Sequence, residues 1–172
     1  MNFTIRRLTE DDAADYRAIR LEGLKDSPKS FGDTYEEAKG RPAHVWTRIF
    51  DGDRAYFGAF IDEKRAGIIN FLPGLGKASA HRGMLLGMYV IPQARRTGCA
   101  LALVQAVLDH AAATGGKQVH LGVGTHNTAA QRLYEKAGFV RYGTEPRGLV
   151  VNGENIDEHL MIRFLDGYDW QP

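Results

Sequence analysis

The residues with the clearest chemical potential lie in one loop between two apolar segments. The nearly continuous apolar run 84–91 is followed by Pro92, by the loop Arg95-Arg96-Thr97-Gly98-Cys99-Ala100, and then by a helical pattern. Small residues at a helix N-terminus leave backbone N–H groups unpaired beside the positive end of the helix dipole. Such a loop suits a phosphate or pyrophosphate, and the two arginines add positive charge. The alternative is an ordinary strand–turn–helix junction with a surface arginine pair.

A second segment, residues 127–139, has the spacing of an amphipathic helix that is capped by Asn127 and ended by Gly138. The two segments together resemble the GNAT N-acetyltransferase superfamily. Residues 95–100 look like its Gln/Arg-x-x-Gly-x-Gly/Ala acyl-CoA signature, and residues 127–139 resemble its other hallmark, in the expected order and at the expected distance.

The resemblance extends over nearly the whole chain and implies a fold. We expect a single GNAT acetyltransferase domain over residues 1–172, of the mixed α/β (α+β) class. Its central mixed, mostly antiparallel sheet would have about six or seven strands, splayed at the CoA-binding strand, with helices on both faces.

The resemblance also implies a reaction. Acetyl-CoA would donate an acetyl group directly to a primary amine of a small molecule or peptide. The backbone of Met88 and Val90 would pair with the pantetheine arm, and Asn127 would contact that arm or position the thiol. Tyr134 would protonate the departing thiolate as the catalytic general acid, although its place on the apolar stripe equally fits a core aromatic. The implied cofactor-binding residues are Met88, Val90, Arg95, Arg96, Thr97, Gly98, Cys99, Ala100, Asn127 and Tyr134.

The base that would deprotonate the amine is not evident. An alkylamine has a pKa of about 10.4 and is protonated at neutral pH, and many relatives carry a glutamate near the strand before the loop. Residues 84–90 contain no carboxylate. The nearby candidates fit surface or capping groups better than a base, so we name no base. They are Glu36, Glu37, His81, His120 and His126.

The missing carboxylate favours an alternative, a non-catalytic acyl-CoA-binding or sensor module on the same fold. A third interpretation is a phosphate-binding α/β domain for another nucleotide. The acceptor is not identified by the sequence, but Phe31 and Tyr35 lie in the segment that would form its pocket, where they would bind substrate or simply pack.

Other features exclude several classes of site and partner. Cys99 is the only cysteine, which excludes an intramolecular disulfide, and we expect it to be a small apolar filler. The histidines form no metal-binding pair, so we expect no metal. The net charge of +1 favours neither nucleic acid nor an acidic membrane. We expect a cytoplasmic protein. Because dimers are common in the superfamily that the chain resembles, we also expect a homodimer.

The elements that must position these residues follow from periodicity and from turn residues. With 172 residues, 44% of them hydrophobic and 25% charged, one packed domain is expected. The order is strand, helices, three strands, helix, strand, helix and two strands, which predicts a mixed sheet with helices on both faces. The predicted strands are 3–8, 54–61, 66–72, 84–91, 118–123, 139–142 and 156–164, and the predicted helical segments are 13–24, 33–39, 42–50, 98–113 and 127–137.

Overall fold

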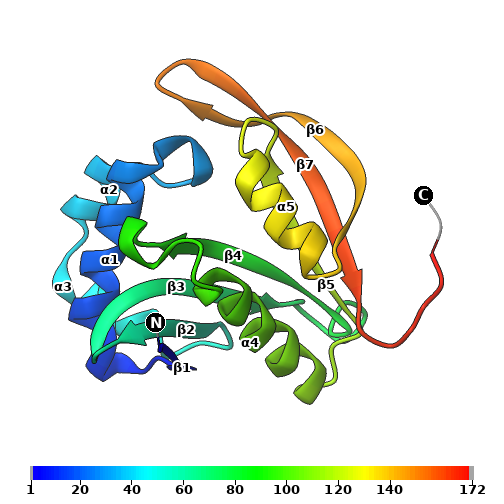
Figure 1. The fold of residues 1–172 in the computed structure, drawn as a ribbon, viewed down its shortest axis with the longest axis horizontal. Helices are drawn as coiled ribbons and strands as arrows, with labels where there is room; N and C mark the ends of the chain where they lie inside the picture. The colour runs from blue at the N-terminus through cyan, green and yellow to red at the C-terminus, as the bar shows by residue number, and fades with distance from the viewer. Residues whose placement is uncertain (1, 171–172) are drawn as a thin grey trace.

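A single seven-stranded sheet forms the centre of the protein, seen here in a computed structural model that describes residues 2–170 (Figure 1). Its strand order is β1-β2-β3-β4-β5-β7-β6, and only β4 and β5 run parallel. The predicted mixed, mostly antiparallel sheet is therefore confirmed. The strands are β1 (Thr4–Arg7), β2 (Ala55–Ile61), β3 (Lys64–Pro73), β4 (Arg82–Val90), β5 (Gln118–Gly124), β6 (Val140–Val151) and β7 (Glu154–Phe164).

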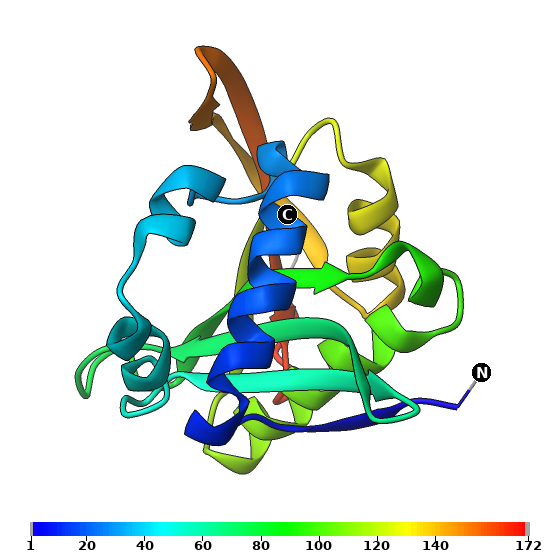
Figure 2. The same cartoon turned by 90° about the vertical axis from the view of Figure 1, so that its left-hand side faces the viewer.

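Helices cover both faces of the sheet, as the element order predicts. Helix α1 (Ala13–Asp26) crosses the strands on one face, with α2 (Tyr35–Gly40) and α3 (Ala43–Arg48) beside it (Figure 2). Helix α4 (Cys99–Ala113) packs on the other face against β2 and β3, and α5 (Thr128–Lys136) lies next to it. Each face has its own buried apolar cluster. No helix among residues 2–170 has the length and apolarity needed to span a membrane.

Local sequence signals explain where the two helices beside the loop begin and end. Helix α4 starts after Gly98, which has φ +91°, and closes at Gly115, which has φ +85°. Both angles lie in the left-handed region that glycine adopts without strain. Helix α5 begins after Asn127, whose Oδ1 accepts the N–H of Ala130 at 3.1 Å, and it ends at Gly138 with φ +85°.

The C-terminal hairpin differs from its prediction. The predicted strand over 139–142 is too short, because β6 extends to Val151 and pairs with β7 along most of its length (Figure 1). Register shifts interrupt the alternation of this strand between Arg141 and Gly143 and between Glu145 and Leu149. A period-two pattern cannot be read through such breaks. A turn at Asn152-Gly153 joins the two strands, with positive φ at both residues.

Candidate active site

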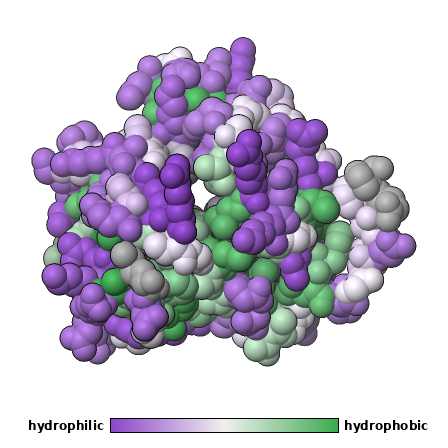
Figure 3. Space-filling view, in the orientation of Figure 1, coloured by the Kyte–Doolittle hydropathy of each residue, from purple (hydrophilic) through white to green (hydrophobic). Residues whose placement is uncertain are grey.

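A cleft of about 1130 Å³ lies between β4 and β5. Its walls come from α1, the start of α4, α5 and the β6–β7 hairpin, so elements from the whole length of the chain meet there. Figure 3 shows the surface hollowed near the centre of the view, below the lobe that the hairpin forms. Among residues 2–170, no group of three His, Cys, Asp or Glu side chains could hold a metal ion.

The cleft exists because β4 and β5 separate. They pair only over Arg82–Met84 and Gln118–His120, although both strands continue well beyond these residues. On the other edge of β4 the register with β3 shifts between Ile68 and Asn70. Gly87 lies at this bulge with φ +60°. Because β5 has separated from β4 at this point, the backbone of β4 beyond Met84 has no strand partner on that edge, where it can contact a ligand.

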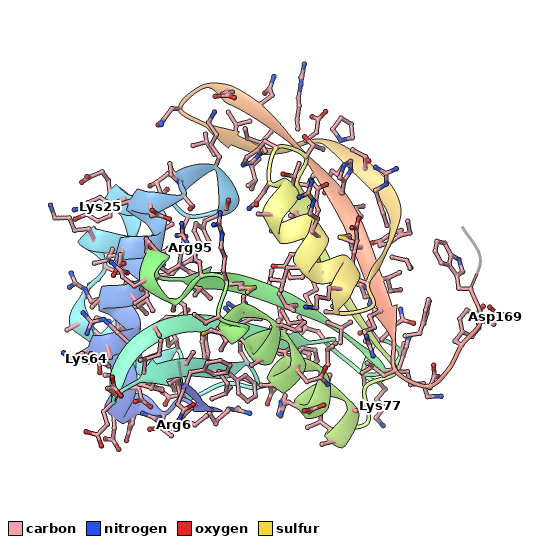
Figure 4. The ribbon with its side chains drawn as sticks, in the orientation of Figure 1. Arg6, Lys25, Lys64, Lys77, Arg95 and Asp169 are labelled. Atoms are coloured by element: carbon pink, nitrogen blue, oxygen red, sulfur yellow. The ribbon has the colours of Figure 1, made fainter. Side chains whose placement is uncertain are left out.

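The end of β4 turns the backbone of Val90 toward the same open edge. Ile91 donates its N–H to Ala66 O at 2.9 Å, so Val90 sits at a non-hydrogen-bonded position and its own N–H and C=O point away from β3. Arg95 Nε donates to Val90 O at 3.0 Å, and Arg95 Nη2 pairs with Asp26 Oδ2 at 2.5 Å. The side chain of Arg95 therefore fastens the loop to the end of α1 (Figure 4), and the N–H of Val90 remains for a ligand.

The loop after β4 has the geometry of an anion site. Arg96 has φ +64° and Gly98 has φ +91°, so two residues of the loop are left-handed, a backbone conformation that occurs in the anion-binding concavities of proteins. The first helical bond of α4 runs from Ala102 N to Gly98 O at 3.1 Å, which leaves the earlier amides without helical partners. Arg96, Gly98 and Ala100 line the cleft.

Two loop residues predicted to bind the cofactor turn their side chains away from the cleft. Thr97 Oγ1 donates to Ala94 O at 2.7 Å and so holds the loop together. Cys99 is fully buried in the α4 core cluster, and burial raises the pKa of its thiol. At these positions only the backbone can serve an anion, and the Cys99 N–H already donates to Thr97 Oγ1 at 3.4 Å. The expectation that Cys99 is an apolar filler agrees with its packing.

Helix α5 brings two of the predicted residues to the cleft. Asn127 caps the helix, and its Nδ2 also donates to Ser30 Oγ at 3.3 Å, which ties the helix to the segment after α1. The Tyr134 hydroxyl reaches across the gap and donates to Met88 Sδ at 3.5 Å. Tyr134 is only 7% exposed, and burial raises the pKa of its phenol. The hydroxyl therefore keeps its proton at neutral pH, as a general acid requires.

The two aromatic residues predicted to bind substrate have different surroundings. Phe31 lines the cleft, where the guanidinium of Arg20 lies 4.5 Å from its ring centre. Tyr35 lies on α2 away from the cleft lining, and its ring contacts the ammonium groups of Lys25 at 4.4 Å and Lys39 at 5.7 Å. The structure therefore brings Phe31 to the cleft and leaves Tyr35 outside it.

A half-buried carboxyl group, Glu158 on β7, faces the cleft from the opposite wall. Two glycines make room for it, because a Cβ at Gly148 would lie 2.8 Å from Glu158 Oε2 and one at Gly122 would lie 3.4 Å away. Burial raises the pKa of this carboxyl, and the charge of the opposite residue Glu145 raises it further. Among residues 2–170, no group forms a hydrogen bond or an ion pair with the Glu158 carboxyl, although the backbone of Glu158 pairs with β5 and β6.

His120 on β5 also lines the cleft. Its Nε2 lies 2.9 Å from Gln118 Nε2 and accepts that amide hydrogen bond in the neutral form. Burial, followed by the charges of Arg82 and His81, lowers the pKa of His120. The imidazole is therefore neutral at neutral pH, with one ring nitrogen already engaged.

Comparison with known proteins agrees with this geometry. The model of the "Acetyltransferase (GNAT) family" matches residues 12–139, a range that contains both the loop and α5. The chain belongs to the GNAT acetyltransferase family. The mycothiol acetyltransferase of Thermobispora bispora is 32% identical over 136 residues, which are 76% of this chain and 44% of that protein. The chain spans about half the length of the curated relatives it matches.

Solved structures show the same fold. The GNAT-family acetyltransferase from Streptococcus pneumoniae superposes with a TM-score of 0.84 at 25% identity and covers 95% of this chain and 99% of its own. A Salmonella typhimurium protein solved with its cofactor acetyl-CoA also reaches a TM-score of 0.84, at 18% identity, with 100% of this chain and 99% of its own covered. At that identity the likeness establishes the fold.

This GNAT acetyltransferase has cleft residues that the sequence analysis did not identify. Glu158 was missed because β7 reads as an ordinary amphipathic strand. The available signal was on β5, where Gly122 and Gly124 alternate with the buried residues Leu121 and Val123, so this face of the strand carries no side chain at two positions. A buried strand face that lacks side chains leaves space for a group from a neighbouring strand or for a ligand.

Proposed function

We propose that the protein transfers an acetyl group directly from acetyl-CoA to a primary amine of a small molecule or peptide. The observation that carries this proposal is the position of the Tyr134 hydroxyl. It crosses the gap between β4 and β5 to Met88, in the same cleft that the Arg96–Ala100 loop lines. A proton donor and an anion site thus share one cleft, with an unpaired strand edge between them.

Several groups of the chain would hold the donor. The amides of the loop and of the first turn of α4 would bind the pyrophosphate, with Arg96 as the cation that is free to face it. The open edge of β4 at Met88 and Val90 would pair with the pantetheine arm. Acetyl-CoA supplies the acetyl group as a thioester. The unpaired backbone amides at the Gly87 bulge would stabilise the negative charge that develops on the thioester oxygen.

Two groups would move protons. Tyr134 would donate its phenolic proton to the leaving thiolate. Glu158 would accept the proton of the attacking amine, because its carboxylate has no partner and its raised pKa moves it toward that of a base working near neutral pH. His120 is the weaker candidate, since Gln118 occupies a ring nitrogen.

Two measurements test the proposal against the alternative of a non-catalytic CoA-binding module. Calorimetric titration should show that acetyl-CoA binds, and a thiol-detecting assay with a broad panel of primary amines should show release of CoA. Binding without release for every amine would support a sensor module. Absence of binding at millimolar acetyl-CoA would contradict both functions.

A further inference from the structure

Buried polar atoms without partners gather in the cleft. In the part of the chain that the structure describes, four buried side-chain atoms have no hydrogen-bond partner, and three of these belong to residues that line the cleft. Buried polar groups in folded proteins are nearly always paired, so an unpaired group needs an explanation. The three atoms are Arg20 Nη1, Trp46 Nε1 and Asn70 Oδ1.

Arg20 has the geometry of an unfilled anion site. Its side chain is 12% exposed, and its Nη2 reaches Asp33 Oδ2 at 3.3 Å. Both terminal nitrogens of the Arg41 guanidinium already donate to the Asp33 carboxylate, at 2.6 and 3.0 Å. Two guanidinium groups therefore share one carboxylate, and Arg20 keeps a donor and much of its charge unpaired.

The unpaired Arg20 nitrogen and the side chain of Asn70 lie beside the bulge of β4. A Cβ at Gly87 would lie 3.6 Å from Arg20 Nη1 and 2.6 Å from Asn70 Nδ2. Asn70 is 3% exposed and Trp46 is 4% exposed, so neither side chain can form a hydrogen bond with bulk water in place of a protein partner. A group that pairs with Arg20 Nη1 must enter the cleft next to the backbone that would hold the thioester.

The two walls of the cleft carry opposite charges. On the side of α1, the cleft is lined by three arginines, Arg20, Arg41 and Arg54, and by one carboxylate, that of Asp33. On the side of the β6–β7 hairpin, it is lined by Glu145 and Glu158. A zwitterion whose anionic and cationic ends lie close together matches this arrangement.

We propose that the acceptor is a free amino acid, whose carboxylate pairs with Arg20 Nη1 and the Trp46 indole N–H while its amine lies beside Asn70 and faces Glu158. This specificity rests on the proposed transfer reaction. Because Arg20 Nη1 lies close to the Gly87 bulge, a carboxylate on Arg20 would lie near the reacting amine, as it does in an α-amino acid. At a peptide N-terminus, the carboxyl group of the first residue is part of a peptide bond and carries no charge. Such an acceptor leaves Arg20 unpaired and is a poor substrate.

Matched acceptors test the proposal on the unmodified protein. Glycine, L-leucine and L-phenylalanine are compared with their C-terminal amides in the CoA-release assay. In each pair, the α-amine of the amide is less basic than that of the acid, so a larger fraction of it is neutral at the assay pH. This difference alone would favour the amides as acceptors. We expect the best acid to exceed its amide in kcat/KM by at least about tenfold, from one charged hydrogen bond. Equal or faster turnover of the amides overturns the carboxylate site.

A variant tests whether Arg20 causes the preference for acids over amides. Arg20→Gln should lower kcat/KM for the acids by about ten- to hundredfold and leave the amides unchanged within about twofold. Arg17→Gln is the matched control, because Arg17 lies on the same helix but donates only to Lys39 O at 3.4 Å, outside the cleft lining. A loss for acids and amides alike in Arg20→Gln would mean that Arg20 only supports the fold.

A binding measurement separates this proposal from the transfer reaction. Calorimetry with CoA-loaded protein compares N-acetyl-L-phenylalanine with its amide. If no amine is turned over, yet the acid binds at least about tenfold more tightly and Arg20→Gln removes that preference, the transfer reaction fails and the carboxylate site stands. If acid and amide bind equally, the carboxylate site is overturned.

Discussion

Substitution of Gly87 is the sharpest test of the β4 bulge. Gly87→Ala forces an L side chain to φ +60°, which costs about 1–2 kcal/mol. The new Cβ would also lie 2.6 Å from Asn70 Nδ2, so the buried Asn70 amide must move. We expect the free energy of unfolding to fall by about 2–3 kcal/mol, which lowers Tm by about 4–12 °C for a chain of this size.

Gly76→Ala is the matched control. Gly76 has φ +78°, and a Cβ there would contact nothing within 4 Å. The substitution carries the same backbone cost of about 1–2 kcal/mol without a steric clash, and it lies outside the cleft lining. It should therefore lower Tm by a few degrees and leave the rate of CoA release unchanged.

The kinetic result separates chemistry from stability. If amides at the bulge stabilise the oxyanion, Gly87→Ala should lower kcat/KM by about 10²- to 10³-fold at a temperature where it remains folded. Its affinity for acetyl-CoA, measured by calorimetry, should change far less. Wild-type kcat/KM in a folded Gly87→Ala protein would refute the role of the bulge. An equal loss in Gly76→Ala would show that both changes act through stability.

Three further predictions concern the proton-transfer groups and the loop. Tyr134→Phe should slow thiol release about 10²-fold or more with little change in acetyl-CoA affinity, whereas an equal loss of affinity would make Tyr134 structural. Glu158→Gln should remove the acidic limb of the pH–rate profile, and an unchanged limb would exclude Glu158 as the base. Burial raises the pKa of Glu158 in the folded protein above its ordinary value of 4.5. The native state therefore loses stability as the pH rises through that folded pKa and the carboxyl ionises. In thermal melts, Glu158→Gln should raise Tm at neutral pH and give no gain below pH 4.5. Arg96→Gln should weaken acetyl-CoA binding in calorimetry and reduce its salt dependence without lowering kcat, and unaltered binding would place the pyrophosphate elsewhere.

The loop and the helix that we propose to hold the donor could be located from the sequence because each is a contiguous segment. Residues 95–100 and 127–139 are contiguous, and their backbone conformations demand glycine or a helix cap at fixed positions, as Gly98 and Asn127 show. The order of strands and helices followed from periodicity for the same reason. The β6 strand was not readable at full length, because Gly143, Pro146 and Gly148 lie where its register breaks.

The acceptor half was not readable because it is assembled from distant segments. Arg20, Trp46, Asn70 and Glu158 come from α1, α3, β3 and β7, and no spacing rule links them. Asn70 did leave a trace, as the one polar residue within the apolar run 66–72 of a buried strand. A single polar residue in such a run is buried at a cost unless something pairs with it.

Unpaired polar groups also explain why donor and acceptor sites differ in character. Backbone amides at a helix start are present in every such fold and bind phosphate whatever the side chains are. An acceptor site must instead distinguish between amines, which requires side chains such as Arg20 and Asn70 that stay unpaired until the right ligand arrives. Each such group lowers the stability of the empty protein by about 1–3 kcal/mol. A ligand that pairs with such a group recovers that loss, so the position of Arg20 Nη1 beside Gly87 indicates where specificity resides.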